Sequence, residues 1–82
     1  MGVLAIMSWR GHTEVTWDEK AIEAGDPEAL AAVREAERIF REERARGAVA
    51  FKVASPTEPA ERIDAFDRTA EQIVMVPRMA GG

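Results

Sequence analysis

The stretch that decides the fold is Ile73-Val74-Met75-Val76-Pro77-Arg78-Met79-Ala80-Gly81-Gly82, the last ten residues of the sequence. Its first four residues are apolar and mostly β-branched, which is typical of a strand in a protein core. Pro77 ends such a strand because it has no N–H to donate and fixes its own φ angle. The five residues after it span about 16 Å when fully extended. We therefore expect a core strand over 72–76 that leads into a free tail.

The tail itself suggests a use. Gly81 and Gly82 have no Cβ to obstruct a narrow channel, and glycine adopts whatever backbone conformation such a channel requires. A tail of this kind can present a carboxylate to the active site of another protein, with Arg78, Met79 and Ala80 as docking residues for that partner. Two plainer explanations remain open, a glycine-rich end without function and an added extension.

Composition narrows the classes of protein. The 82 residues suffice for one domain, and a net charge of −4 argues against a nucleic-acid partner. The absence of cysteine excludes disulfides, a thiol nucleophile and a zinc–thiolate site. The apolar run Val3 to Met7 is too short for the core of a signal peptide or for a membrane span. We therefore expect a cytoplasmic protein with no membrane partner.

The N-terminal part predicts a hairpin over residues 3–17. Val3 to Trp9 has apolar residues on both faces, which indicates a strand buried on both sides or near the centre of a sheet. Arg10 to His12 is the expected connector, with a glycine available for positive φ. Thr13 to Trp17 alternates like a half-buried strand. We expect Trp9 and Trp17 to be cross-strand core partners, and an exposed tryptophan would instead be an anchor for a partner.

The clearest local signal is the start of a long helix. Asp26 can cap free N–H groups, Pro27 suits the first helical position, and Glu28 complements the helix dipole. The helix should run to Arg46 and end at Gly47 in a left-handed conformation. Before it, residues 18–25 suggest a loop with a helical turn around 19–24.

The two sides of this helix differ in character. The apolar side comprises Ala29, Leu30, Ala32, Val33, Ala36, Ile39 and Phe40. The charged side comprises Glu35, Arg38, Glu42 and Arg46. Charge pairs at helical spacing stabilise a helix only weakly, so we interpret the charged side as a solvated face.

The C-terminal half predicts two further strands before the last one. Ala48 to Val53 should be a strand with Val49, Phe51 and Val53 on one face. Ser55 to Glu61 is a proline-rich loop, and Arg62 to Phe66 suggests a short strand. Asp67 should start a tight turn that runs through Ala70. A sheet with one helix packed across one face is the simplest way to bury this pattern.

This order of elements, with a final strand leading to Gly-Gly, resembles the β-grasp fold of ubiquitin-like proteins. Val76 to Gly82 looks like the end of the small sulfur-carrier subunit of molybdopterin synthase. The stretches Gly11 to Asp18 and Phe66 to Glu71 are similar to paired motifs of small bacterial and phage proteins. The resemblance implies an α+β fold, with a mixed sheet of four to five strands and one main helix on one face. Its domain would cover 1–77 and its flexible tail 78–82.

The resemblance also implies a chemistry. Such proteins are activated by an ATP-dependent adenylating enzyme, similar to ubiquitin-activating enzymes, which forms an acyl-adenylate at the terminal glycine. Here that residue would be Gly82, with Gly81 as the slender approach. A sulfur donor then gives a thiocarboxylate, or a lysine amine of a target protein gives an isopeptide bond. Lys20 would be the main acceptor in self-conjugation, because Lys52 falls in a predicted strand.

Other groups of reactive residues give weaker signals. His12 is the only histidine, and without an orienting partner we interpret it as a turn residue. Asp64, Asp67 and Glu71 match no calcium-loop pattern, so we expect Asp67 to stabilise a turn. Met75 should pack in the core.

Two classes of function follow from these observations. The first is a ubiquitin-like modifier or sulfur carrier that acts through Gly82. The second is a non-catalytic protein–protein interaction or accessory module whose Gly-Gly end is incidental. An enzyme acting on its own is not expected, since the sequence shows no nucleophile–base pair, metal set or phosphate loop. No catalytic residue, metal site or cofactor is therefore predicted.

Overall fold

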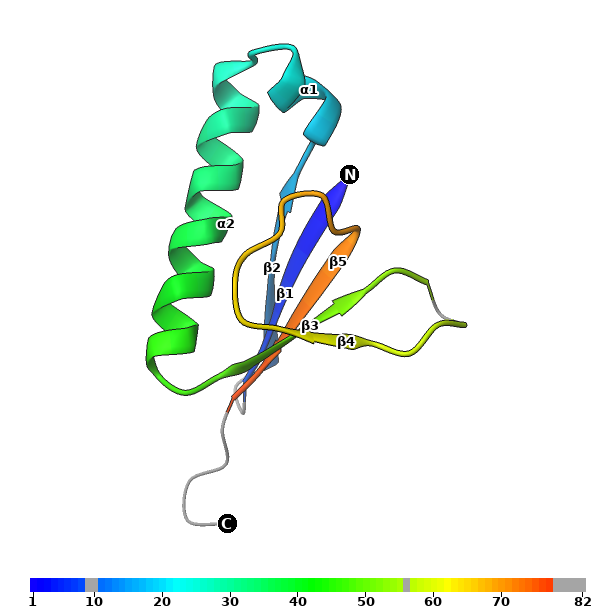
Figure 1. The fold of residues 1–82 in the computed structure, drawn as a ribbon. Helices are drawn as coiled ribbons and strands as arrows, with labels where there is room; N and C mark the ends of the chain where they lie inside the picture. The colour runs from blue at the N-terminus through cyan, green and yellow to red at the C-terminus, as the bar shows by residue number, and fades with distance from the viewer. Residues whose placement is uncertain (9–10, 56, 78–82) are drawn as a thin grey trace.

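The chain adopts an α+β fold in which one long helix packs on one face of a five-stranded mixed sheet (Figure 1). The structure is a computed structural model and describes residues 1–8, 11–55 and 57–77. This is the predicted β-grasp-like class, with the predicted number of strands and one main helix.

The order of strands in space differs from their order in the chain. The elements are β1 (Gly2–Ser8), β2 (Gly11–Trp17), α1 (Glu19–Glu23), α2 (Pro27–Ala45), β3 (Val49–Val53), β4 (Glu61–Ile63) and β5 (Gln72–Val76). Across the sheet the order is β2-β1-β5-β3-β4. The last strand is therefore the central one, parallel to β1 and antiparallel to β3.

The predicted N-terminal hairpin is confirmed, but its connector is shorter than expected. Ser8 pairs with Gly11, so Gly11 and His12 are the first residues of β2 and not part of the turn. Gly11 has a φ of +122°, a region that favours glycine. Trp9 lies outside the described residues. The cross-strand partner of Trp17 is Gly2, so the predicted pairing of the two tryptophans is wrong.

Both helices begin after a capping aspartate, and for α2 this is the predicted start. The Asp18 carboxylate accepts from the N–H of Lys20 and of Ala21 at the start of α1. The Asp26 carboxylate accepts from the Glu28 N–H at 2.9 Å, and Pro27 is the first residue of α2. At the other end Gly47 has a φ of +98°, as the predicted left-handed stop requires.

The core lies between α2 and the face of the sheet that α2 covers. From α2 it includes the predicted residues Ala29, Val33, Ala36 and Phe40. From the strands it includes Leu4, Trp17, Ala50, Ile73 and Met75. Phe66 packs against two aromatic rings of this core. Its ring centroid is 5.2 Å from that of Trp17 and 5.7 Å from that of Phe40.

The fourth strand is shorter than predicted and begins earlier. It includes Glu61, which the sequence placed in the loop, and ends at Ile63. The chain leaves the sheet there because its next side chains have partners elsewhere. Asp64 forms an ion pair with Arg44 of α2 at 3.2 Å, and Phe66 packs against the core.

Candidate functional site

The residues predicted to be activated or to dock a partner are Arg78, Met79, Ala80, Gly81 and Gly82, and they lie outside the described residues. The described segment next to them is the end of β5. This strand is paired on both sides, with Met75 aligned to Ile6 of β1 and to Ala50 of β3. Val76 and Pro77 are exposed at the end of β5. The tail is therefore attached to the central strand of the sheet.

The sheet face opposite α2 is rich in apolar residues. Strand alternation and the strand registers place eight of them on this outer face, namely Val3, Ala5, Met7, Val49, Phe51, Val53, Val74 and Val76. Two of them are strongly exposed, Met7 at 44% and Val76 at 41%, and both lie at the end where β5 leads into Pro77. No element in the described ranges covers this face.

The third strand has its predicted shared face on the outer side of the sheet. Val49, Phe51 and Val53 do share one face, but the core takes Ala48 and Ala50 instead. The sequence signal for this apolar outer face is the presence of apolar residues on both faces of β1 and β5. With a single main helix, only one face can be covered, so the second apolar face is left to solvent or to a partner.

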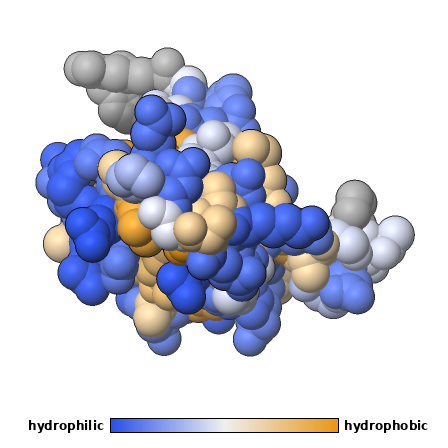
Figure 2. Space-filling model, turned by 90° about the horizontal axis from the view of Figure 1, so that it is seen from above, coloured by the Kyte–Doolittle hydropathy of each residue, from blue (hydrophilic) through white to orange (hydrophobic). Residues whose placement is uncertain are grey.

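A hollow lies on this outer face, at the end away from Pro77. It has a volume of about 530 Å³ and is lined by Met1, Val3, Glu14, Val53, Ala54, Ser55, Glu71 and Gln72. Figure 2 views the molecule from the end that carries α1 and the N-terminus, where mostly hydrophilic residues surround apolar ones. The hollow and Pro77 therefore lie at opposite ends of the sheet.

Two of the three clustered carboxylates, those of Asp64 and Asp67, have separate partners. Asp64 pairs with Arg44, whereas Asp67 accepts from the Thr69 N–H at 2.9 Å and from Lys52 at 3.3 Å. The predicted turn is confirmed, with the Ala70 N–H donating to the Asp67 carbonyl. The Thr69 hydroxyl, the Thr69 N–H and Lys52 together lower the pKa of the Asp67 carboxyl. In the described part of the chain, no three acidic or histidine side chains form a group suited to a metal ion.

The two lysines differ as possible acceptors of a conjugated tail. Lys20 is exposed on α1, as self-conjugation would require. Lys52 lies in β3 as predicted, and its ammonium group contacts the carboxylates of Asp67 at 3.3 Å and Glu61 at 3.7 Å. Lys20 is the more accessible of the two amines.

His12 is placed differently from its predicted role in a turn. It lies in β2, and its Nε2 is 3.7 Å from the Glu14 carboxylate on the same face of the strand. The two side chains are 57% and 52% exposed. In this position His12 has an acidic neighbour that the sequence interpretation did not assign to it.

Trp17 and Met75 are core residues, as predicted. Met75 has no exposed surface, and Trp17 is 2% exposed. The Trp17 indole N–H donates to the Arg68 carbonyl at 2.8 Å, so the turn after Asp67 packs against the end of β2. A Cβ on Gly2 would lie 2.1 Å from the Trp17 ring, so this position requires glycine.

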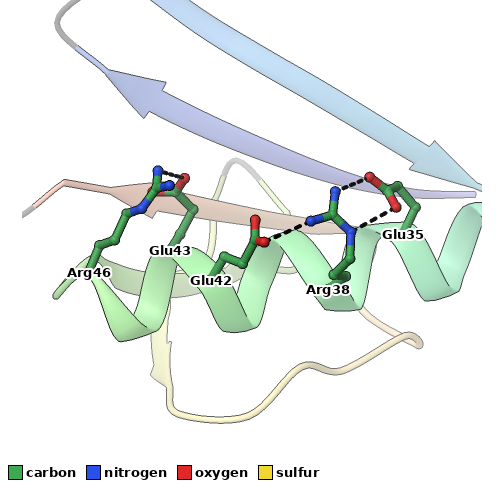
Figure 3. A network of polar contacts seen from close by, with 5 residues as sticks. All are labelled: Glu35, Arg38, Glu42, Glu43 and Arg46. Atoms are coloured by element: carbon green, nitrogen blue, oxygen red, sulfur yellow. Dashed lines mark hydrogen bonds and ion pairs between the residues drawn. The ribbon is translucent and has the colours of Figure 1, made fainter.

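Ion pairs line the outward side of α2 and include two separate groups, Glu35–Arg38–Glu42 and Glu43–Arg46 (Figure 3). Arg38 donates to Glu35 and to Glu42, the latter at 2.8 Å. Its hydrogen bonds lower the pKa of the Glu35 carboxyl. Arg46 pairs with Glu43 at 3.4 Å and not with Glu42. These groups satisfy one another, which agrees with a solvated face.

Comparisons with protein-family models, curated proteins and solved structures found no match to this chain. No helix within the described ranges is long and apolar enough to cross a membrane.

Proposed function

We propose that the protein is a ubiquitin-like modifier or sulfur carrier that a partner enzyme activates at Gly82. The observation that carries the proposal is the position of β5. This strand is hydrogen-bonded between β1 and β3, and in the sequence it is followed by Pro77 and then by the segment that contains Gly81 and Gly82. A central strand gives a partner a rigid reference from which a narrow tail can be guided. The β-grasp-like order of elements supports the same reading.

The chemistry would belong to the partner. A carboxylate is a poor electrophile, so the Gly82 carboxylate oxygen would first attack the α-phosphate of ATP and displace pyrophosphate. A sulfur donor or a lysine amine would then attack the acyl carbon of the acyl-adenylate and displace AMP. This chain would supply the tail and a docking surface, so it needs no catalytic group of its own.

The described residues next to the tail suit the docking role. Val76 and Met7 form an exposed apolar surface at the end of the sheet that leads to the tail. Arg78, Met79 and Ala80 would extend this contact toward the active site of the adenylating enzyme. In self-conjugation Lys20 would be the acceptor, since Lys52 is engaged by two carboxylates.

The deciding experiment co-expresses the chain with its neighbouring genes and measures intact mass. We expect adducts or a thiocarboxylate on the parent chain and on a Lys52→Arg control. Deletion of Gly82 or the substitution Gly81→Trp should abolish them without changing thermal stability. Identical profiles for the parent and the Gly82 deletion would reject the proposal.

The alternative is a non-catalytic interaction module with an incidental Gly-Gly end. The exposed apolar surface at Met7 and Val76 favours it, because such surfaces mark binding sites. In that case Met7→Lys should abolish binding of a co-purified partner, whereas deletion of Gly82 should have no effect. The reverse pattern supports activation at the tail.

A further inference from the structure

The two edges of the sheet are protected to very different degrees. The edge strand β4 has only three residues and follows a proline-containing loop, which limits pairing with another strand. The other edge strand, β2, has seven residues, and none of them is proline or lysine. Four of its side chains, those of His12, Thr13, Glu14 and Thr16, are exposed. Only one edge is therefore open for strand addition.

The direction of the β2 backbone groups follows from its partner. The Val3 N–H donates to the Glu71 carbonyl at 3.0 Å, away from β2. Because backbone groups alternate in direction along a strand, Leu4, Ile6 and Ser8 bond to β2. Their partners in β2 are Val15, Thr13 and Gly11. The backbone groups of the alternate residues His12, Glu14 and Thr16 consequently point outward from the free edge.

The side chains on this edge are complementary to themselves in one register. If two copies of β2 pair antiparallel about Thr13, each His12 lies opposite Glu14 of the other copy. The His12–Glu14 contact within each chain would then become a group of two imidazoles and two carboxylates, attractive when the imidazoles are protonated. A register centred on Glu14 would instead place two carboxylates opposite each other, which is unfavourable.

We propose that β2 is a homodimerisation edge, paired antiparallel with β2 of a second copy about Thr13. The two sheets then form one continuous sheet through the outward backbone groups of His12, Glu14 and Thr16. The strand that pairs with this edge is β2 of a second copy, because the charge pattern of β2 is complementary to itself in the antiparallel register. The proposal does not depend on the proposed function, since β5 is central and remains separated from this edge by β1.

Single cysteines test the register directly, because the chain contains none. In the proposed dimer, two Thr13→Cys residues face each other in a non-hydrogen-bonded pair, with Cα atoms about 4.5 Å apart, close enough for a disulfide. The matched control is Thr16→Cys, an exposed threonine of the same strand. Its two copies would lie about 20 Å apart, six residues along the strand direction.

We expect mild oxidation to convert the folded Thr13→Cys variant into a covalent dimer and to leave Thr16→Cys monomeric. Circular dichroism verifies that both variants fold. Equal cross-linking of the two, or faster cross-linking at Thr16→Cys, would overturn the register.

Sedimentation equilibrium of cysteine-free variants tests the association itself. The parent should dimerise reversibly, and Glu14→Lys should weaken the dimer at least tenfold by placing a lysine opposite His12. The double variant His12→Glu/Glu14→Lys restores opposite charges across the interface and should recover most of the affinity. A parent that stays monomeric at millimolar concentration would overturn the proposal and leave this edge to a strand of another protein. Failure of the charge swap to recover dimerisation would contradict the role of His12 and Glu14.

Discussion

Gly2 and Trp17 show how strongly one position in this chain depends on its neighbour. The indole ring lies over the Gly2 backbone, and its N–H reaches the Arg68 carbonyl. The ring is nearly fully buried, so it has little room to move. A tryptophan at the end of an edge strand is thus accommodated by the residue opposite it.

Gly2→Ala should therefore destabilise the protein by about 1–3 kcal/mol, the usual cost of overpacking. Without the ring, alanine would be the better strand residue, so the sign of the effect is diagnostic. Urea unfolding measures it. In a Trp17→Phe background the smaller ring should reduce the cost of Gly2→Ala. An equal cost in both backgrounds would show that the ring is not the cause.

Asp67 predicts a defined dependence of stability on pH. Its hydrogen bonds hold the carboxyl pKa below the ordinary value of 3.8 in the folded state. The charged form therefore stabilises the fold above about pH 4, and this contribution is lost as the pH falls through the folded pKa. Asp67→Asn should cost about 1 kcal/mol at pH 7, a modest value because the side chain is partly exposed.

Denaturant unfolding at several pH values tests this linkage. The difference in unfolding free energy between parent and Asp67→Asn should shrink as the pH is lowered from 4 toward 2. The exposed Glu58 provides the control, and Glu58→Gln should produce no comparable difference at pH 7. A difference for Asp67→Asn that is constant with pH would contradict the assigned role of its charge.

At the scale of elements, Phe40 is the largest apolar side chain on the face of α2 that packs against the core. Phe40 is 2% exposed and meets Phe66 edge to face. Phe40→Ala should cost about 3–5 kcal/mol in unfolding free energy, a large fraction of the stability of a small domain. The control Arg41→Ala, on the exposed side of the same helix, should have little effect. Equal stability of the parent and the Phe40 variant would contradict this packing.

The position of β5 predicts the pattern of amide exchange. Ile73 to Met75 lie in the middle of the sheet, whereas β4 is a three-residue edge strand. Exchange followed by NMR should therefore be slowest in the β1–β5–β3 centre and much faster in Glu61 to Ile63. Comparable protection of β4 and β5 would show that the order of strands does not govern local stability.

At the scale of the whole molecule, the buried core runs from Leu4 to Met75. We therefore expect a chain truncated after Pro77 to unfold in one cooperative transition at the same temperature as the parent. Differential scanning calorimetry measures both. A clear fall in the transition temperature would mean that the last five residues contribute to the folded domain and are not a separate arm.

The sequence by itself determined where the elements lie, because their signals act over a few residues. Asp26 and Pro27 start α2, Gly47 ends it, and Pro77 ends β5. The apolar side of α2 could likewise be predicted from the sequence, because helical spacing alone defines which residues share a face. The class of fold followed from the order of these elements.

Only the tertiary structure decided which apolar face is covered and which residues meet. Ala48 and Ala50 face the core while Phe51 lies on the outer face, and alternation alone allows either choice when both faces are apolar. The pairing of Gly2 with Trp17 and the open edge at β2 also depend on strand order and register. These are set by contacts between residues far apart in the chain, which no local pattern encodes.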